Sequence, residues 1–183
     1  MSTSTKLKLA AALSLAATVL LGVLYAVTAC DILLSLAITC GTFAYHLIMR
    51  LLVGLIFTLL MRNRANYRAR WYRVGEREQA MYKRLGVHKW KRHMPSYDGA
   101  SFDMKTHRPD EIAQVMCQSE LVHETIVALS FLPIAAGHFF GAYPVFVATS
   151  VLAAAIDASF AVVQRYNRPR ILKLIQMQKK RRG

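Results

Sequence analysis

The sequence predicts an all-α integral membrane protein with about four transmembrane helices and a basic cytoplasmic loop that contains an interfacial amphipathic helix. Hydrophobic residues make up 55% of the 183 residues, which is above the usual range of soluble domains. They are gathered into four long stretches, and the charged residues lie mainly between and after these stretches. The 24 Lys and Arg residues outnumber the 10 Asp and Glu residues, for a net charge of +14. A disordered chain is excluded, because disorder requires low hydrophobicity.

The first two apolar stretches occupy residues 7–29 and 32–61. A spanning helix needs about 20 mostly apolar residues, and the first stretch has this length with a single charge, Lys8. The second stretch is longer than one span requires and contains His46 and Arg50. It either crosses the membrane as one tilted helix or breaks near Arg50 and continues as a shallow interfacial segment.

A rival interpretation makes the first stretch a secretory signal. Residues 27–30 (VTAC) resemble a lipoprotein processing box, which would lipidate Cys30. The apolar stretch is long for a signal, however, and another apolar stretch follows at once. An uncleaved helix is therefore favoured.

The last two stretches, residues 119–140 and 142–163, predict an antiparallel helical hairpin. Only a short turn with Gly141 and Pro144 separates them, as is usual for neighbouring antiparallel helices. The second of the two contains a single charge, Asp157.

Basic residues predict the orientation of the protein. Residues 62–108 contain 13 Lys and Arg residues and residues 165–182 contain eight more, whereas the turns near Asp31 and Gly141 contain none. By the positive-inside rule, both termini lie in the cytoplasm of a multi-pass cytoplasmic-membrane protein. We therefore expect four parts: N-terminal transmembrane helices (1–61), a basic cytoplasmic or interfacial loop (62–118), a transmembrane hairpin (119–163) and a basic cytoplasmic tail (164–183).

Two parts of the basic loop have distinct patterns. Residues 66–86 predict a helix with an aromatic face and a basic face, suited to the lipid headgroup boundary and ended by Gly86; a plain positive-inside loop is the alternative. The next segment contains Lys89, Trp90 and Lys91, and such clustered cations suit phosphates of anionic lipid headgroups or of a carrier such as coenzyme A. No RNA-recognition pattern is present, so no nucleic-acid partner is expected.

Charged groups inside the apolar stretches predict a pair between helices. His46 and Arg50 are four residues apart and share a helical face. Because an intramembrane charge is costly and usually paired, we expect Asp157 to pair with Arg50 or His46. Structural support between helices is the favoured role of this pair.

Two constellations are candidates for chemistry. Glu120 and His123 are three residues apart on a predicted helix, so the carboxylate can orient the imidazole as a general base. His93 and Asp98 match the HxxxxD pattern of glycerolipid acyltransferases and are a minor alternative. No metal site is expected, because a di-metal bundle would need further Glu residues on other helices.

Three blocks of sequence resemble a known family in both order and spacing. They are QRYNRPR at residues 164–170, KWK at residues 89–91 and ELVH at residues 120–123. From about residue 70 to its end, the chain is similar to the glycosyl-4,4'-diaponeurosporenoate acyltransferases, the final enzymes of staphyloxanthin synthesis. The resemblance implies a membrane-bound O-acyltransferase that moves a fatty acyl group onto a sugar hydroxyl of a glycosylated carotenoid or a related glycolipid.

An antiparallel hairpin would place Glu120 and His123 beside the QRYNRPR block. We then expect an acyl-CoA or acyl-carrier-protein co-substrate, with no bound cofactor. Its phosphates would contact Lys89, Lys91, Arg165 and Arg168, and Tyr166 or Asn167 would contact the oxyanion or the acceptor. The rival is a non-enzymatic membrane protein whose basic loop and tail bind anionic lipids or a partner enzyme. A homo-oligomer is compatible with both interpretations.

Overall fold

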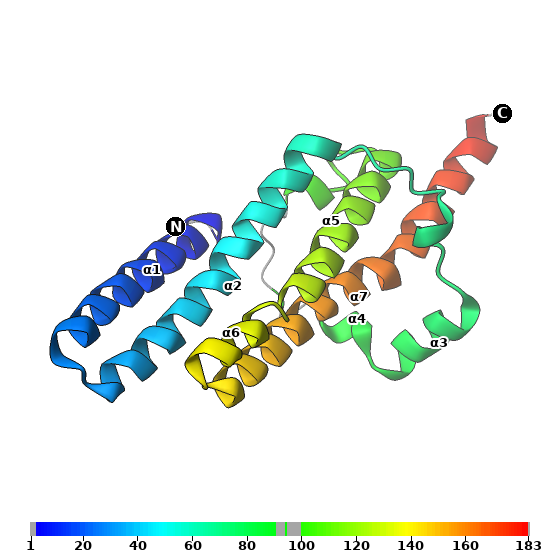
Figure 1. Cartoon of the computed structure of the whole chain (residues 1–183). Helices are drawn as coiled ribbons and strands as arrows, with labels where there is room; N and C mark the ends of the chain where they lie inside the picture. Colours follow the sequence, from blue (N-terminus) through cyan, green and yellow to red (C-terminus); the bar gives the residue numbers. More distant parts are fainter. Residues whose placement is uncertain (1–2, 91–93, 95–99, 183) are drawn as a thin grey trace. The chain divides into compact units, whose positions relative to one another are not determined.

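The computed structural model describes residues 3–90, 94 and 100–182 (Figure 1). These residues form helices and connecting turns, and no strand occurs among them. The elements in chain order are α1 (Thr3–Thr28), α2 (Asp31–Met61), the 3₁₀ turn η1 (Arg70–Tyr72), α3 (Glu76–Arg84), α4 (Val87–Trp90), η2 (Ala100–Phe102), α5 (Pro109–Leu129), α6 (Pro133–Phe140) and α7 (Tyr143–Arg182).

Four helical segments are long and apolar enough to cross a membrane, which confirms the predicted fold class. They are Thr3–Thr28, Asp31–Met61, Pro109–Phe140 and Tyr143–Arg181. Large apolar side chains on them are exposed in the isolated chain, including Leu60 at 78% and Phe139 at 80%. Such exposure is expected of surfaces that face lipid tails rather than water.

The chain divides into two compact units. Unit 1 comprises Met1–Leu55 and Thr125–Ile156, and unit 2 comprises Ile56–Glu124 and Asp157–Gly183. Helices α2, α5 and α7 each contribute residues to both units.

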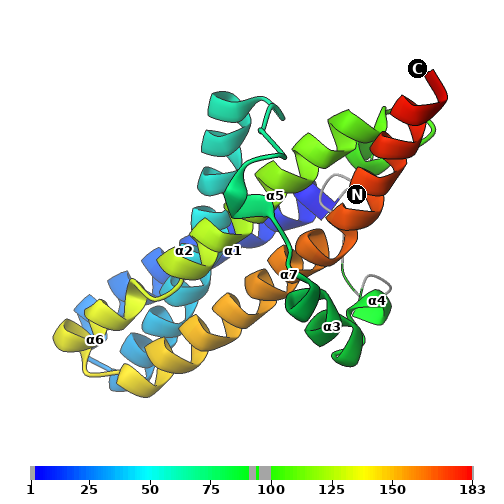
Figure 2. The ribbon, with the colours of Figure 1, turned by 90° about the vertical axis from the view of Figure 1, so that its right-hand side faces the viewer.

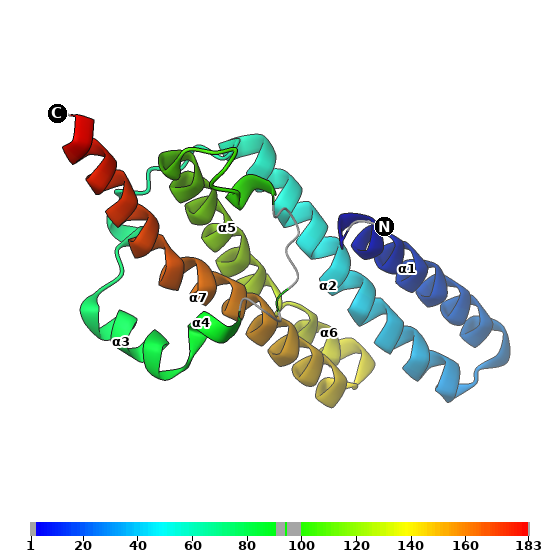
Figure 3. The ribbon, with the colours of Figure 1, turned by 180° about the vertical axis from the view of Figure 1, so that it is seen from behind.

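Within unit 1, α1 and α2 lie side by side (Figure 3). They pack closely at Gly41, where a Cβ atom would lie 3.2 Å from Thr18 Cγ2. Helix α2 is continuous through Arg50, so the shallow interfacial alternative does not apply. The guanidinium of Arg50 donates hydrogen bonds to the carbonyl oxygens of His46 (3.2 Å) and Ala153 (3.3 Å).

The third apolar segment differs from the expected single helix over residues 119–140. Helix α5 begins earlier, at Pro109, and the helical run is interrupted before α6 starts at Pro133. Proline causes this interruption, because its ring lacks an N–H and clashes with the preceding turn. Gly141, at a φ of 67°, ends α6 in the left-handed conformation.

The prediction of one helix over residues 66–86 is wrong. Only Glu76–Arg84 is α-helical, and Gly75 before it is extended, with φ −76° and ψ 163°. Burial explains the difference: Tyr72 packs with Ala65 and Cys117, whereas Tyr82 packs with other partners on α4 and α7. These two aromatic side chains therefore face the protein and not a headgroup layer.

In unit 2, α3 and α4 lie beside α7 (Figure 2). Tyr82 and Val87 form a buried cluster there with Val163 and Tyr166. Gly86 ends α3 with a φ of 65°, as expected for a C-terminal cap. Helix α7 continues through Pro169 without ending.

Candidate active site

The candidate active site lies in unit 2, on facing positions of α5 and α7. His123 Nδ1 on α5 is 2.9 Å from Asp157 Oδ1 on α7. The Asp157 side chain is only 3% exposed, whereas that of His123 is 21% exposed. The imidazole stacks on Phe160, with ring centroids 4.8 Å apart and an interplanar angle of 11°. Two contacts therefore fix the plane and the direction of the ring.

This pairing has a chemical consequence for the other ring nitrogen. A carboxylate at Nδ1 favours the tautomer that carries its proton there, which leaves Nε2 as a proton acceptor. Within the part of the chain that the structure describes, Nε2 of His123 has no hydrogen-bond partner. His123 thus has the arrangement of a general base that a small hydroxyl group can reach.

Glu120 does not take the expected place beside His123. Its fully buried carboxylate accepts hydrogen bonds from Arg165 Nη1 (2.6 Å) and from Arg168 Nη1. Three helical residues turn the chain by about 300°, so the two side chains point roughly 60° apart. That angle directs Glu120 to the two arginines and His123 to Asp157.

Arg165 connects Glu120 to α3. Its Nε and Nη2 donate to the Glu78 carboxylate at 2.6 and 3.1 Å, and weaker bonds reach the carbonyls of Trp71 and Arg73 at 3.3 and 3.4 Å. All its nitrogens therefore have partners within the protein. Phosphate binding by Arg165, as expected from the sequence, finds no support in this arrangement.

Arg168 is likewise engaged internally. Its side chain is fully buried, it donates to the carbonyl of Tyr72, and its guanidinium lies 5.1 Å from the centroid of the Tyr72 ring. A soluble phosphate has no access to a guanidinium in this position. Together, Glu78, Glu120, Arg165 and Arg168 form a charge-balanced cluster that holds η1 and α3 against α5 and α7.

The cluster affects the ionisation of residues on α3. Burial alone would raise the pKa of the Glu78 carboxyl, but hydrogen bonds from Arg165 and Tyr82 outweigh it and hold this pKa below its usual value of 4.5. Burial and the 2.5 Å hydrogen bond to Glu78 raise the pKa of Tyr82 to about 12. At neutral pH the tyrosine is therefore the donor and the carboxylate is the acceptor.

The other predicted site residues on α7 have local partners. Tyr166 is 4% exposed, and its hydroxyl accepts a hydrogen bond from Arg170 at 2.9 Å. Asn167 donates its amide to the carbonyl of Val163, also at 2.9 Å. Contact of either side chain with an oxyanion or an acceptor stays a prediction.

Several further predictions cannot be placed in this site. Lys89 is exposed on α4, while Lys91, His93 and Asp98 lie outside the described residues. The expected pairing of Asp157 with Arg50 or His46 would join the two units and stays a prediction. Among the described residues, no group of three or more His, Cys, Asp or Glu side chains is placed to hold a metal ion.

Sequence reasoning missed two contacts beside the candidate base. The first is the His123–Asp157 pair itself. The second joins Trp71 Nε1 to Glu124 Oε2 at 2.9 Å, which ties η1 to the residue that follows His123. The register of the hairpin could have indicated the first contact. His123 follows Glu120 on α5, so on an antiparallel helix its partner must precede Arg165, the partner of Glu120, as Asp157 does.

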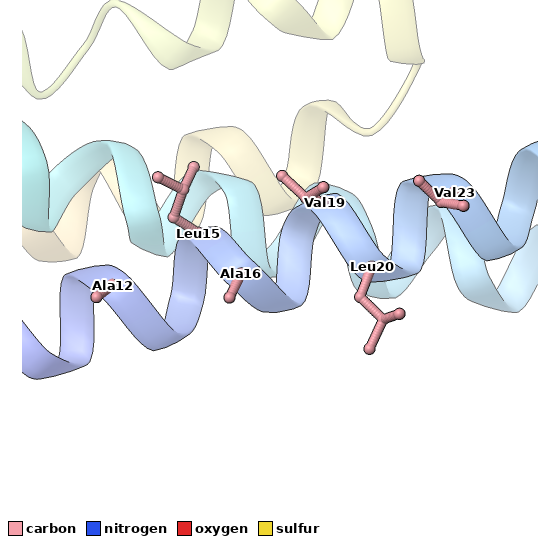
Figure 4. A pocket seen from close by; sticks show the side chains of 6 residues that line it. All are labelled: Ala12, Leu15, Ala16, Val19, Leu20 and Val23. Carbon is pink, nitrogen blue, oxygen red and sulfur yellow. The ribbon is translucent and has the colours of Figure 1, made fainter.

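A groove of about 560 Å³ lies on α1 (Figure 4). All the side chains that line it are apolar and come from this one helix: Ala12, Leu15, Ala16, Val19, Leu20 and Val23. It offers no group that could take part in acid–base or nucleophilic chemistry.

Comparison with known proteins identifies the family. The profile of the glycosyl-4,4'-diaponeurosporenoate acyltransferases matches residues 64–177, which include His123, Asp157 and the charge cluster. Comparisons with curated proteins and with solved structures find no match. The chain therefore belongs to the glycosyl-4,4'-diaponeurosporenoate acyltransferase family and is an acyltransferase of carotenoid biosynthesis, with a glycosylated carotenoid as its acceptor.

Proposed function

We propose that the protein is a membrane-embedded O-acyltransferase in which His123 is the general base and Asp157 orients it. The observation that carries this proposal is the 2.9 Å contact between His123 Nδ1 and Asp157 Oδ1, on a ring that is partly exposed. Acyl transfer to a sugar hydroxyl requires removal of the hydroxyl proton, and histidine performs this step most often in enzymes.

The reaction would proceed by direct transfer from a thioester. Nε2 of His123 accepts the proton of a sugar hydroxyl while the hydroxyl oxygen forms a bond to the thioester carbonyl carbon. The C–S bond then breaks, the ester is formed, and the imidazolium returns the proton to the departing thiolate. Asp157 stabilises the imidazolium between the two proton transfers.

The membrane would separate the two substrates. Asp157 precedes Arg165 by eight residues, so it lies about 12 Å from that position along α7. With the basic loop and both termini in the cytoplasm, His123 lies near the cytoplasmic boundary of the bilayer. The thioester donor, acyl-CoA or acyl-carrier protein, arrives from the cytoplasm, while the carotenoid part of the acceptor stays among lipid tails.

The charge cluster has a supporting role in this proposal. Glu120, Arg165 and Arg168 would hold α5 and α7 together beside His123 without contact with the reacting atoms. Removing one member of a buried ion pair is costly, because the remaining charge is left without compensation. A protein that only binds lipids is not retained as an alternative, since the chain belongs to an acyltransferase family.

The test compares lipids from cells that supply the glycosylated carotenoid and carry wild-type protein, His123→Ala or His138→Ala. His138 lies on α6 and contacts Phe139, so its variant controls for the loss of a histidine from a helix of the membrane region. We expect mass spectrometry to show a product one fatty-acyl mass heavier with wild type and with His138→Ala, but not with His123→Ala. Full product formation by a normally inserted His123→Ala protein would refute the proposed role of His123.

A further inference from the structure

A second pocket lies in unit 2, where α2 ends and α5 begins. It has a volume of about 290 Å³, and the cationic or titratable nitrogens on its lining belong to Arg62, Arg64 and His107. Both arginines are exposed. Neither guanidinium forms an ion pair with another residue of the described ranges, in contrast to Arg165 and Arg168. Among the described residues, therefore, the guanidiniums of this pocket have no carboxylate partner, unlike those of the charge cluster.

The charge of the lining is positive. Among the described residues of the lining, the one carboxylate is that of Glu111. This side chain is already engaged, because its Oε2 accepts a hydrogen bond from the backbone N–H of Arg108 at 2.9 Å and caps the start of α5. The two guanidiniums thus outnumber this carboxylate, which already caps a helix.

The backbone at the pocket is held in an unusual conformation. Arg62 and Asn63 have φ angles of 49° and 59°, in the left-handed region that non-glycine side chains rarely adopt. The Asn63 N–H donates to Oε1 of the buried Gln118 at 2.8 Å, which secures this turn. Left-handed residues of this kind cluster at ligand sites, and here the turn brings Arg62 and Arg64 to one pocket.

The size and the donors of the pocket fit a single phosphate group. Ligand pockets usually measure about 300–1,000 Å³, so this one suits one compact group and not a whole coenzyme. Guanidinium groups bind phosphate oxygens in a bidentate manner. Gln114 adds a neutral donor. Nδ1 of His107 lies 2.9 Å from Thr106 Oγ1, and no described residue pairs with its Nε2.

We propose that the pocket of Arg62, Arg64 and His107 binds the phosphate of the phosphopantetheine arm of the acyl donor. This inference rests on the proposed function, because it assumes a phosphopantetheine thioester. Glu111 in the pocket and His123 in the active site are twelve residues apart on α5, or about 18 Å. The long arm between the phosphate and the thioester of such donors would run along this helix toward His123.

The test uses two donors that differ only in the phosphate: acyl-phosphopantetheine and acyl-pantetheine with the same acyl chain. The full-length protein is assayed in phosphatidylcholine nanodiscs with the glycosylated carotenoid. We expect wild type to prefer the phosphorylated donor at least about tenfold in kcat/KM, and the double variant Arg62→Gln/Arg64→Gln to lose this preference. Gln keeps a Cβ atom at both positions, so the backbone constraint at residue 62 is unchanged.

A matched control removes the same charge outside the pocket. Arg68 and Arg70 are exposed in the same loop, and Arg68→Gln/Arg70→Gln is expected to keep the wild-type preference. An equal loss in this control would overturn the proposal in favour of general electrostatic attraction. An unchanged preference in Arg62→Gln/Arg64→Gln, or equal use of both donors by wild type, would also overturn it.

Two further arms separate the alternatives. Nanodiscs with phosphatidylglycerol test a lipid headgroup as the source of the phosphate. If Arg62→Gln/Arg64→Gln lowers activity only in these discs and keeps the donor preference, the pocket binds lipid and the donor assignment is overturned. Calorimetric binding of phosphopantetheine tests the pocket without chemistry. If wild type binds this probe, the double variant does not, and neither donor is used, the pocket stands and the proposed function falls.

Discussion

At the scale of single residues, the proposed acyl transfer depends on the contact between His123 and Asp157. An amide in place of the carboxylate can still reach Nδ1, but it no longer favours the tautomer that leaves Nε2 free, and it no longer stabilises the imidazolium. We expect Asp157→Asn to lower kcat by about 10²- to 10⁴-fold with little change in KM. Steady-state kinetics of the purified protein checks this.

Phe160→Leu is the control for this prediction. It removes the stacked ring but leaves the ion pair, so we expect a loss of kcat below about tenfold. Wild-type kcat in Asp157→Asn would mean that the pair only supports the packing of α5 on α7.

Glu120 is expected to act on stability and not on chemistry. Replacing it by Gln leaves Arg165 and Arg168, which are both largely buried, with one carboxylate fewer. We expect Glu120→Gln to lower the free energy of unfolding by about 3–5 kcal/mol. The unfolding midpoint in detergent measures this loss, and the folded fraction should keep the wild-type kcat.

Glu124→Gln provides a comparison on the same helix. The described partner of Glu124 is Trp71, which is 63% exposed. Loss of this hydrogen bond should therefore lower the free energy of unfolding much less than Glu120→Gln does. A loss of kcat without a loss of stability in Glu120→Gln would return Glu120 to the role of orienting His123.

At the scale of elements, the attachment of α3 should depend on pH through Glu78. The pKa of this carboxyl is lowered in the folded protein, so the contact is fully stabilising above the usual value of 4.5 and is lost as pH falls below it. We expect hydrogen exchange of α3 amides, corrected for intrinsic rates, to be faster at about pH 3.5 than at about pH 6.

Two variants on α3 sharpen this prediction. Glu78→Gln should give fast exchange at both pH values, because the ion pair with Arg165 is absent throughout. Glu76 is exposed in the first turn of the same helix, so Glu76→Gln should keep the wild-type pH dependence. Slow, pH-independent exchange in wild type would show that the apolar contacts of Tyr82 suffice to hold α3.

The turn between α6 and α7 depends on the absence of a side chain at Gly137. A Cβ atom there would lie 2.6 Å from the Tyr143 ring, whereas a Cβ atom at Gly22 would meet nothing within 4 Å. We expect Gly137→Ala to lower the free energy of unfolding by about 1–3 kcal/mol and Gly22→Ala to have little effect. Equal unfolding midpoints of the two variants would contradict this close packing.

At the scale of the whole molecule, the membrane-spanning helices were predictable, because a run of about 20 apolar residues rarely forms anything else. The helix ends were less predictable. The 66–86 segment is rich in helix-forming residues on both sides of Gly75, yet burial of Tyr72 and Tyr82 in separate clusters divides it. Local propensity is a weak guide where tertiary packing decides.

The residues of the site were also more predictable than the contacts between them. The sequence singled out Glu120, His123, Asp157, Arg165 and Arg168, and the structure brings all five together in unit 2. Which carboxylate meets which base depends on the register and rotation of α5 against α7. A single sequence does not contain this information, because each of these side chains satisfies the same spacing rules with more than one partner.

The native cysteines offer a test of how the whole chain crosses the membrane. Cys30 is exposed in the turn between α1 and α2, whereas Cys117 is fully buried. The predicted orientation, with both termini in the cytoplasm, would place this turn outside the cell. We expect a membrane-impermeant maleimide to label intact cells at Cys30, and Cys30→Ser to abolish the labelling. Labelling only in inverted vesicles would show that the orientation is the opposite of the predicted one. A lipid-modified Cys30 would stay unlabelled from both sides, and its peptide would carry the mass of an acyl group.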